Sequence, residues 1–193
     1  MFMGGVMCGR LNVTDDPLAR IVSELVGINF SPQQSVDLRP TNKVSTIAYR
    51  HGGYYQHDLC WGFKPEWASR HIINAKAETA AIKPTFRQAF AYHRVVVPCS
   101  GWYEWREETS RKQKYLFSNP QGLPLYLAGL AVDGQFLVIL TTEPSPQYRP
   151  YHSRMPVLLP EASIMFWISA PPHQAQSCLY PGWQPRLSVQ AVE

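Results

Sequence analysis

The sequence predicts a mainly antiparallel β-sheet that curls or closes on itself, flanked by a few helices. Short strand-like segments recur along the middle of the chain, and turn signals such as Gly52-Gly53 and Asp133-Gly134 separate them. The length of 193 residues fits a single domain. The expected strands cover residues 44–50, 54–62, 94–99, 113–118, 124–132 and 135–142.

Helices are expected at two places. Asp15 or Asp16 caps a helix with Pro17 in its first turn, and apolar residues recur at helical spacing until Gly27 ends it. A short helix over 161–167 follows a proline. Residues 31–42 predict an extended loop, and the prolines beyond Trp167 predict an irregular tail.

The composition favours a soluble protein, and because no cluster of His, Cys, Asp and Glu has the spacing of metal ligands, neither a metal nor a cofactor is expected. Hydrophobic residues make up 45% and charged residues 17% of the chain, and no apolar run approaches the ~20 residues of a membrane span. The first six residues lack the basic segment of a signal peptide, so we expect a cytoplasmic protein. Its cysteines should be free thiols, since they form no CxxC pair; they are Cys8, Cys60, Cys99 and Cys178.

The positive charge lies entirely in the first half of the chain. Residues 1–96 hold 11 Lys or Arg against 7 Asp or Glu, whereas residues 97–193 hold 7 of each. Between residues 61 and 96 the cations alternate with Trp61, Phe63, Trp67 and Phe86. Cations and aromatic faces suit a single-strand nucleic-acid groove. The alternative is a solvated basic face over core aromatics.

Four stretches concentrate residues that could carry chemistry: 8–10 (CGR), 74–79 (NAKAET), 101–105 (GWYEW) and 152–156 (HSRMP). A carboxylate between aromatic rings, as at Glu104, loses hydration and gains a raised pKa suited to acid–base catalysis. The alternative is a Glu104 that points outward from a strand whose aromatic neighbours point inward. His152 could shuttle a proton or be an ordinary surface histidine.

Taken in this order, these stretches resemble the SRAP family, named for SOS response-associated peptidase. The motifs MCGR, RPT, WGF, NAKAET, FR, GWYEW and HSRMP cover Cys8 to about Val157, and the tail fits less well. The resemblance implies a compact α+β fold on a curled, β-barrel-like sheet. It also implies a monomer that binds single-stranded DNA and captures abasic sites covalently in the DNA damage response, associated with the nucleoid in a bacterial host.

The resemblance implies roles for four residues. Cys8 would be the nucleophile, whose α-amine and thiol close a thiazolidine on the aldehyde of the ring-opened sugar. Asn74 would orient the sugar, Glu104 would assist Schiff-base formation, and His152 would protonate the opening sugar oxygen. An α-amine with a pKa of about 7.7–8.0 is partly neutral at physiological pH and attacks an aldehyde without a specialised base.

The same resemblance assigns the groove. Arg10, Lys76, Arg87 and Arg154 would contact phosphates, and Pro40 and Trp67 would lie against bases. Lys76 stands where arginine is common in the family. A lysine keeps the charge but lacks the planar guanidinium, so it fixes phosphate geometry less strictly.

Residues 1–7 depart from the family pattern, in which the cysteine follows the initiator methionine. The SRAP domain is expected over 8–193, and the extension should be absent from or removed in the active form. Three alternatives remain: translation begins at Met7, the protein cleaves its own Met7–Cys8 bond as a thiol autopeptidase, or the extension stays. In the last case Cys8 has an amide nitrogen, and the protein would be a non-covalent single-stranded DNA-binding module.

Overall fold

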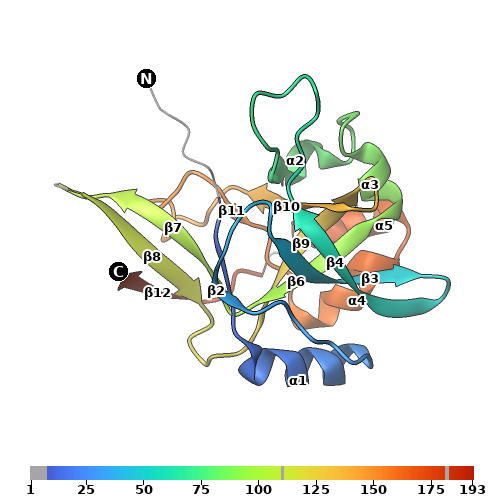
Figure 1. Ribbon diagram of the computed structural model, residues 1–193, viewed down its shortest axis with the longest axis horizontal. Helices are drawn as coiled ribbons and strands as arrows, with labels where there is room; N and C mark the ends of the chain where they lie inside the picture. Colours follow the sequence, from blue (N-terminus) through green and yellow to red (C-terminus); the bar gives the residue numbers. More distant parts are fainter. Residues whose placement is uncertain (1–7, 110, 181–182) are drawn as a thin grey trace.

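The structure, a computed structural model, describes residues 8–109, 111–180 and 183–193. The expectations for the extension before Cys8 lie outside these residues. Two sheets and several short helices form the fold (Figure 1). The strands are β1 Leu11–Val13, β2 Ser35–Leu38, β3 Lys43–Arg50, β4 Gly53–Trp61, β5 Asn74–Lys76, β6 Arg94–Cys99, β7 Gly101–Glu107, β8 Lys112–Ser118, β9 Leu125–Val132, β10 Phe136–Thr142, β11 Met155–Pro156 and β12 Ser188–Val192. The helices are α1 Asp15–Val26, α2 Ala77–Ala80, α3 Arg87–Tyr92, η1 Glu161–Ser163, α4 Ile164–Ser169, α5 Pro172–Ala175 and η2 Gln176–Leu179.

The larger sheet closes into a ring. Its strands follow the order β11-β10-β4-β3-β6-β9, and β9 pairs again with β10, so that β10, β4, β3, β6 and β9 encircle a common interior. The described pairs are antiparallel except where β10 runs parallel to β4 and β5. The expected α+β fold on a curled, mainly antiparallel sheet is confirmed.

Alternate residues of the ring strands face two different cores. One face supplies residues such as Ile47, Val96 and Leu130 to a core that also contains the apolar residues of α1, α3 and α4, so this face is the outside of the ring. The other face supplies Leu59, Val97 and other residues to a second core inside the ring. The period-2 alternation of buried strands explains this division.

The second sheet has the order β12-β8-β7-β1-β2 and lies on the left of Figure 1, where β7 and β8 form a long hairpin. Trp102 of β7 and Phe117 of β8 stack with ring centroids 5.0 Å apart and join the interior core of the ring. The first residue of β7 is Gly101, and a larger residue would not fit there because an added Cβ would lie 2.3 Å from the backbone oxygen of Phe117. The two sheets therefore share one core.

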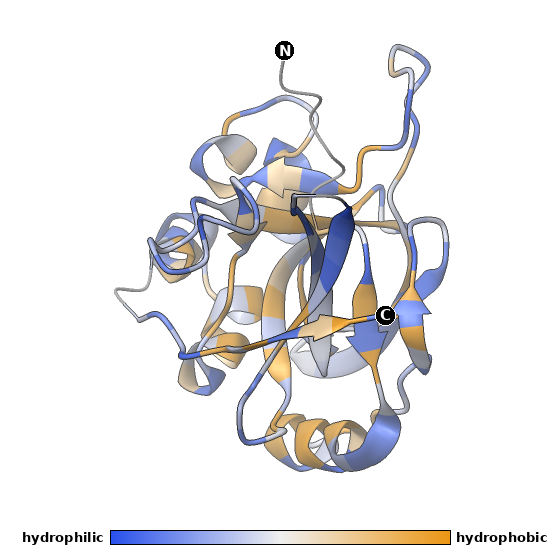
Figure 2. Ribbon diagram, turned by 90° about the vertical axis from the view of Figure 1, so that its left-hand side faces the viewer, coloured by the Kyte–Doolittle hydropathy of each residue, from blue (hydrophilic) through white to orange (hydrophobic). Residues whose placement is uncertain are grey.

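The first helix agrees with the expectation. α1 ends at Gly27, whose left-handed φ of 74° suits glycine. Thr14 precedes the helix without a capping side-chain bond, and Asp16 has extended backbone angles (φ −98°, ψ 124°), so the regular turns begin at Pro17 and Asp16 occupies the predicted cap position. Along α1, which lies beneath the strands, apolar and polar positions alternate (Figure 2), and its buried residues pack against the outer core.

Three segments differ from their sequence-based description. The expected loop at 31–42 contains β2, which pairs with β1. The expected helix over 161–167 divides into η1 and α4 and extends to Ser169. The tail is not irregular throughout, since β12 pairs with β8 over five residues from Ser188 to Val192. These strands are short and polar, and pairing with a neighbour fixes them more than their own sequences do.

No helix in the described part of the chain is both long and apolar enough to cross a membrane.

Candidate functional site

The pairing of β1 with β7 places Cys8 beside Glu104. Leu11 lies opposite Trp102, and the Tyr103 amide donates a 3.0 Å hydrogen bond to the Arg10 carbonyl. Followed back along the chain, this antiparallel register brings Gly9 opposite Glu104, so that Cys8 is one residue away from that position. The Cys8 backbone N–H donates a 3.2 Å hydrogen bond to Glu104 Oε1.

Glu104 is the only buried carboxylate among the described residues, with 3% of its surface exposed. Within those residues no basic side chain forms an ion pair with it. Burial raises the pKa of Glu104 to about 8, although the Cys8 N–H and the neighbouring Trp102 indole oppose the shift. At neutral pH this side chain is mainly a carboxylic acid and can donate a proton.

The alternative of an outward-pointing Glu104 is wrong. Trp102 and Glu104 share the face of β7 that turns to the core, and Trp102 is fully buried there. Tyr103 and Trp105 occupy the opposite face, beneath the cations Arg10 and Lys114. Strand alternation holds, but with the opposite sense: the charged residue faces the core and its aromatic neighbours face the cations.

Cys8 is fully buried and has a left-handed backbone φ of 40°. This conformation is unfavourable for a residue with a Cβ. Burial raises the pKa of the Cys8 thiol well above its usual value, and the charges of Glu104 and Cys99 raise it further. Cys99 is also fully buried, and burial raises its pKa to about 12. The four described cysteines are free, with Cys60 partly exposed and Cys178 buried.

Strand β10 pairs with the segments next to the other two predicted catalytic residues, Asn74 at its middle and His152 shortly before β11 at its end. β5 pairs with β10, which places Asn74 opposite Ile139, and Asn74 Nδ2 donates to the Ile139 carbonyl at 3.4 Å. β11 pairs with the last residues of the same strand and follows the segment that contains His152. Lys76 lies opposite Thr141 and is exposed.

His152 has a defined tautomer. Its Nδ1 accepts a 3.1 Å hydrogen bond from the Arg154 backbone N–H, so the proton of the neutral ring lies on Nε2. Burial lowers the pKa of His152. The preceding residue, Tyr151, packs edge-on against Tyr115, which lies opposite Glu104 across the β7–β8 pair. No hydrogen bond between described residues joins His152 to Cys8 or Glu104.

Two of the three arginines predicted to contact phosphates, Arg10 and Arg154, form ion pairs with carboxylates. Arg154 donates two hydrogen bonds to Glu78, at 2.8 and 2.7 Å, and its guanidinium group lowers the pKa of the Glu78 carboxyl. Arg10 bonds both oxygens of Asp37, at 2.7 and 3.0 Å. A strand of DNA would compete with these carboxylates for the guanidinium groups.

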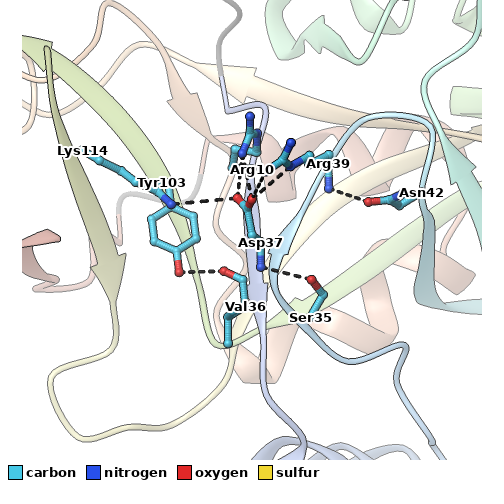
Figure 3. A network of polar contacts seen from close by, with 8 residues as sticks. All are labelled: Arg10, Ser35, Val36, Asp37, Arg39, Asn42, Tyr103 and Lys114. Atoms are coloured by element: carbon cyan, nitrogen blue, oxygen red, sulfur yellow. Dashed lines mark hydrogen bonds and ion pairs between the residues drawn. The ribbon is translucent and has the colours of Figure 1, made fainter. Parts of the chain in front are cut away.

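Asp37 is the centre of a cation cluster (Figure 3). Besides Arg10 it binds Arg39 at 2.6 Å, and Lys114 Nζ lies 3.9 Å away. Burial alone would raise the pKa of Asp37, but its hydrogen bonds with Arg10 and Arg39 and their charges lower it overall. Lys114 Nζ also lies 4.1 Å from the centre of the Tyr103 ring, whose hydroxyl donates to the Val36 carbonyl at 2.8 Å.

The predicted base-contacting residues are accessible. Pro40 lines a cavity of about 380 Å³ with Gly9, Arg10 and Trp105. Trp67 is 72% exposed, and Arg87 is exposed at the start of α3. Of the other aromatic residues that alternate with cations in the sequence, Trp61 and Phe86 are buried and Phe63 is partly buried, so the core explanation is correct for the first two.

Sequence reasoning missed Asp37, Glu78 and Lys114. Glu78 stood in the NAKAET motif, two residues beyond Lys76, and its acidic charge beside a predicted phosphate contact was a usable signal. Asp37 lay in the presumed loop, and nothing in the sequence indicated its pairing with Arg10. No group of three His, Cys, Asp or Glu side chains in the described ranges is placed to hold a metal ion.

Comparison with known proteins places the chain in a family. The sequence profile of SOS response associated peptidase (SRAP) matches residues 7–193. The chain belongs to the SRAP family. The motifs in the sequence placed the end of the similarity near Val157, but the family profile matches to the last residue and includes β12.

Several relatives of this SRAP protein have names that state a function. The abasic site processing protein YedK of Escherichia coli is 26% identical over 84% of this chain and 79% of its own. The abasic site processing protein YoaM of Bacillus subtilis is 29% identical over 91% of this chain and 86% of its own.

Solved structures share the SRAP fold. A phage-related protein of Bordetella bronchiseptica has a TM-score of 0.79 and 24% identity, covering 96% of this chain and 94% of its own. A protein from Bacteroides thetaiotaomicron has a TM-score of 0.73 and 18% identity, covering 94% and 91%. These likenesses support the architecture described above.

Proposed function

We propose that this SRAP protein processes abasic sites in single-stranded DNA, by forming a thiazolidine between Cys8 and the exposed aldehyde of the sugar. The observation that carries the proposal is the 3.2 Å contact between the Cys8 nitrogen and Glu104 Oε1. The nitrogen that would attack the aldehyde lies against a carboxyl group whose pKa is raised to about 8. The names of YedK and YoaM support the same substrate.

The first steps need an amine on Cys8 and an acid beside it. The free α-amine adds to the aldehyde carbon and gives a carbinolamine. Glu104 then gives its proton to the departing hydroxyl, which leaves as water, and a protonated Schiff base and a carboxylate remain. The unpaired, buried position of Glu104 keeps this proton available at neutral pH.

Ring closure returns the proton to Glu104. Because burial raises the pKa of the Cys8 thiol, the thiol enters this step protonated. The Glu104 carboxylate accepts the thiol proton, and the sulfur adds to the Schiff-base carbon to close the five-membered ring. Glu104 thus ends as the acid that it was at the start, and the thiol need not ionise in isolation within the core.

Opening of the closed sugar requires a separate proton donor, for which we propose His152. Its Nδ1 is occupied by the Arg154 N–H, which leaves Nε2–H to face the sugar oxygen. To give up that proton the ring must first take a second proton on Nδ1, in place of the contact with the Arg154 N–H, and the lowered pKa makes the resulting imidazolium a stronger acid. Asn74, held on the β10 edge, would position the sugar, and Lys76, Arg87 and Arg154 with Arg10 would hold phosphates around Pro40 and Trp67.

The deciding experiment mixes protein translated from Met7 with a single-stranded oligonucleotide that contains one abasic site. We expect a heat-stable protein–DNA band that is lost in Cys8→Ala. The matched control is Cys99→Ala, which removes the other fully buried thiol and should keep the band. A band that survives in Cys8→Ala, or the absence of any band with the wild-type protein, would overturn the proposal.

A second activity, self-cleavage of the Met7–Cys8 bond, is favoured by the left-handed φ of Cys8 and by the Glu104 contact to the nitrogen of that bond. The Cys8 thiol would attack the Met7 carbonyl, Glu104 would protonate the leaving nitrogen, and water would then hydrolyse the thioester. Intact mass spectrometry of the full chain should show loss of the first seven residues, and Glu104→Gln should prevent it. A stable full-length mass would exclude this activity and leave translation from Met7 as the source of the amine.

A further inference from the structure

The β-ring has a second accessible end, remote from Cys8. A cavity of about 460 Å³ opens there, bordered by the end of β3, the first half of β4, the start of β6 and the β9–β10 turn. The β3–β4 hairpin at this end lies on the right of Figure 1, away from β7 and β8. Mouths of β-barrels are common positions for ligand sites.

Small residues make the cavity possible. Ala48, Val95 and Ala131 line it and belong to the interior core of the ring. The same inward face carries Gly129, where an added Cβ would lie 3.0 Å from Leu137 and 3.2 Å from Val95. The ring interior is therefore tightly packed at its middle and hollow at this mouth.

The rim combines the Arg50 cation with histidine rings and accessible tyrosine rings. Arg50, His57 and His93 border the cavity, and no Asp or Glu among the described residues lines it. Burial lowers the pKa of His57; the charge of Asp58 raises it and that of His93 lowers it, so the two imidazoles lie close enough to interact. The Arg94 guanidinium is not available, because it bonds the carbonyls of Phe90 and Trp167.

Three of the ten exposed large hydrophobic residues in the described chain line this one cavity. They are Tyr49, Tyr55 and Tyr92, with exposed fractions of 36%, 37% and 76%. The Tyr55 and His57 rings lie 5.7 Å apart and 32° from coplanar, which leaves a broad aromatic surface along β4. Tyrosines at this density beside cations are typical of surfaces that stack nucleobases.

We propose that this barrel mouth is a nucleotide-binding site, with a base stacked on the tyrosines and its phosphate held by Arg50 and His93. The site is separate from Cys8 and does not depend on covalent capture of abasic sites. Its ligand is either a free mononucleotide or one nucleotide of a strand that extends from the other end of the ring. Both sources share the same base and phosphate chemistry.

The test is a titration of the full chain, uniformly labelled with ¹⁵N, with deoxyadenosine monophosphate, followed by two-dimensional NMR. We expect saturable shifts at Arg50, Tyr55, His57 and His93 and none at Cys8 or Gly9. Tyr92→Ala and Arg50→Gln should each weaken binding about fivefold or more. Arg20→Gln, on the exposed surface of α1, is the control and should leave the affinity unchanged.

Parallel titrations separate the outcomes. Inorganic phosphate and deoxyadenosine alone should each bind more weakly than the nucleotide. Saturation by phosphate with equal affinity would show a simple anion site and overturn the proposal, as would the absence of shifts with both millimolar nucleotide and the longest oligonucleotide. Single-stranded oligonucleotides of increasing length distinguish the two sources of the nucleotide. If Arg50 and Tyr92 contribute to affinity only for the longer strands, the site binds one nucleotide of a strand that runs along the protein. If they already contribute to affinity for the mononucleotide, the site binds a free nucleotide.

Discussion

Two carboxylates lie close to β1, and their surroundings give them opposite properties. Glu104 is buried and has no cationic partner within residues 8–109, 111–180 and 183–193, and its pKa rises to about 8. Asp37 is contacted by Arg10, Arg39 and Lys114, and its pKa falls. A carboxyl group therefore acts as a proton donor on the core face of β7, whereas on the outer side it is the shared anion of three cations. Such divergence of neighbouring carboxyl groups commonly separates acid from electrostatic roles.

The largest effect should follow from removing the proton of Glu104. Glu104→Gln keeps the size and an oxygen to accept from the Cys8 nitrogen, but cannot transfer a proton. We expect the rate of crosslink formation to fall about 100-fold or more, the usual contribution of a positioned acid. Single-turnover gels at saturating DNA measure this rate. Glu107→Gln, an exposed position on the same strand, is the control, and a Glu104→Gln rate near that of the control would refute the acid role.

The next effect concerns stability. Folding raises the pKa of Glu104 from its ordinary value of 4.5 to about 8. Below pH 4.5 the carboxyl is protonated in both the folded and the unfolded state, so it does not affect stability differently between them. As the pH rises from 4.5 through about 8, the unfolded state loses the proton first and the folded state loses stability. At ~1.4 kcal/mol per pKa unit this amounts to a few kcal/mol. Urea denaturation at pH 5 and pH 8.5 should show a smaller decline for Glu104→Gln than for the wild type. Parallel declines would show that Glu104 ionises freely in the fold.

The strands differ in how well they could be predicted from the sequence. The six predicted strands agree with the structure to within a residue or two at their ends, because runs of strand-forming residues between turn signals mark them in the sequence. β7 was not predicted, since GWYEW places aromatic residues on both faces of the strand and its alternation is hidden. The proximity of Cys8 to Glu104 depends on the β1–β7 register, which local patterns could not establish; the family resemblance implied only the roles of the two residues.

The outer surface was harder to predict than the buried pair. Arg10 and Arg154 were expected to be available cations, and both carry carboxylate partners from elsewhere in the chain. Sequence separations of 27 and 76 residues make such partners invisible to charge patterning along the chain. Fold topology alone brings them together.

A smaller effect should follow from removing the charge of Asp37. Asp37→Asn would release Arg10 and leave Arg39 and Lys114 without their shared anion, so we expect tighter binding of single-stranded DNA. The slope of log K against log salt should steepen by about 0.7 for each cation that gains a phosphate. Fluorescence anisotropy at several salt concentrations measures this slope. Glu24→Gln on α1 removes the same charge elsewhere and should change the slope little; equal effects of both variants would show that only net charge matters.

The smallest effect is expected at Lys114. Its amine lies 3.9 Å from Asp37 and 4.1 Å from the Tyr103 ring centre, and the lysine and aspartate side chains are 22% and 28% exposed. Partly screened contacts of this kind contribute about 1 kcal/mol or less. Lys114→Gln should therefore lower the free energy of urea unfolding only slightly, and 1 M salt should reduce the difference further. A decrease in the free energy of unfolding as large as that expected from ionisation of Glu104 would mean that the cation cluster around Asp37 stabilises the β7–β8 hairpin as strongly as the core does. The contrast between the buried Glu104 and the partly exposed Asp37 would then no longer hold.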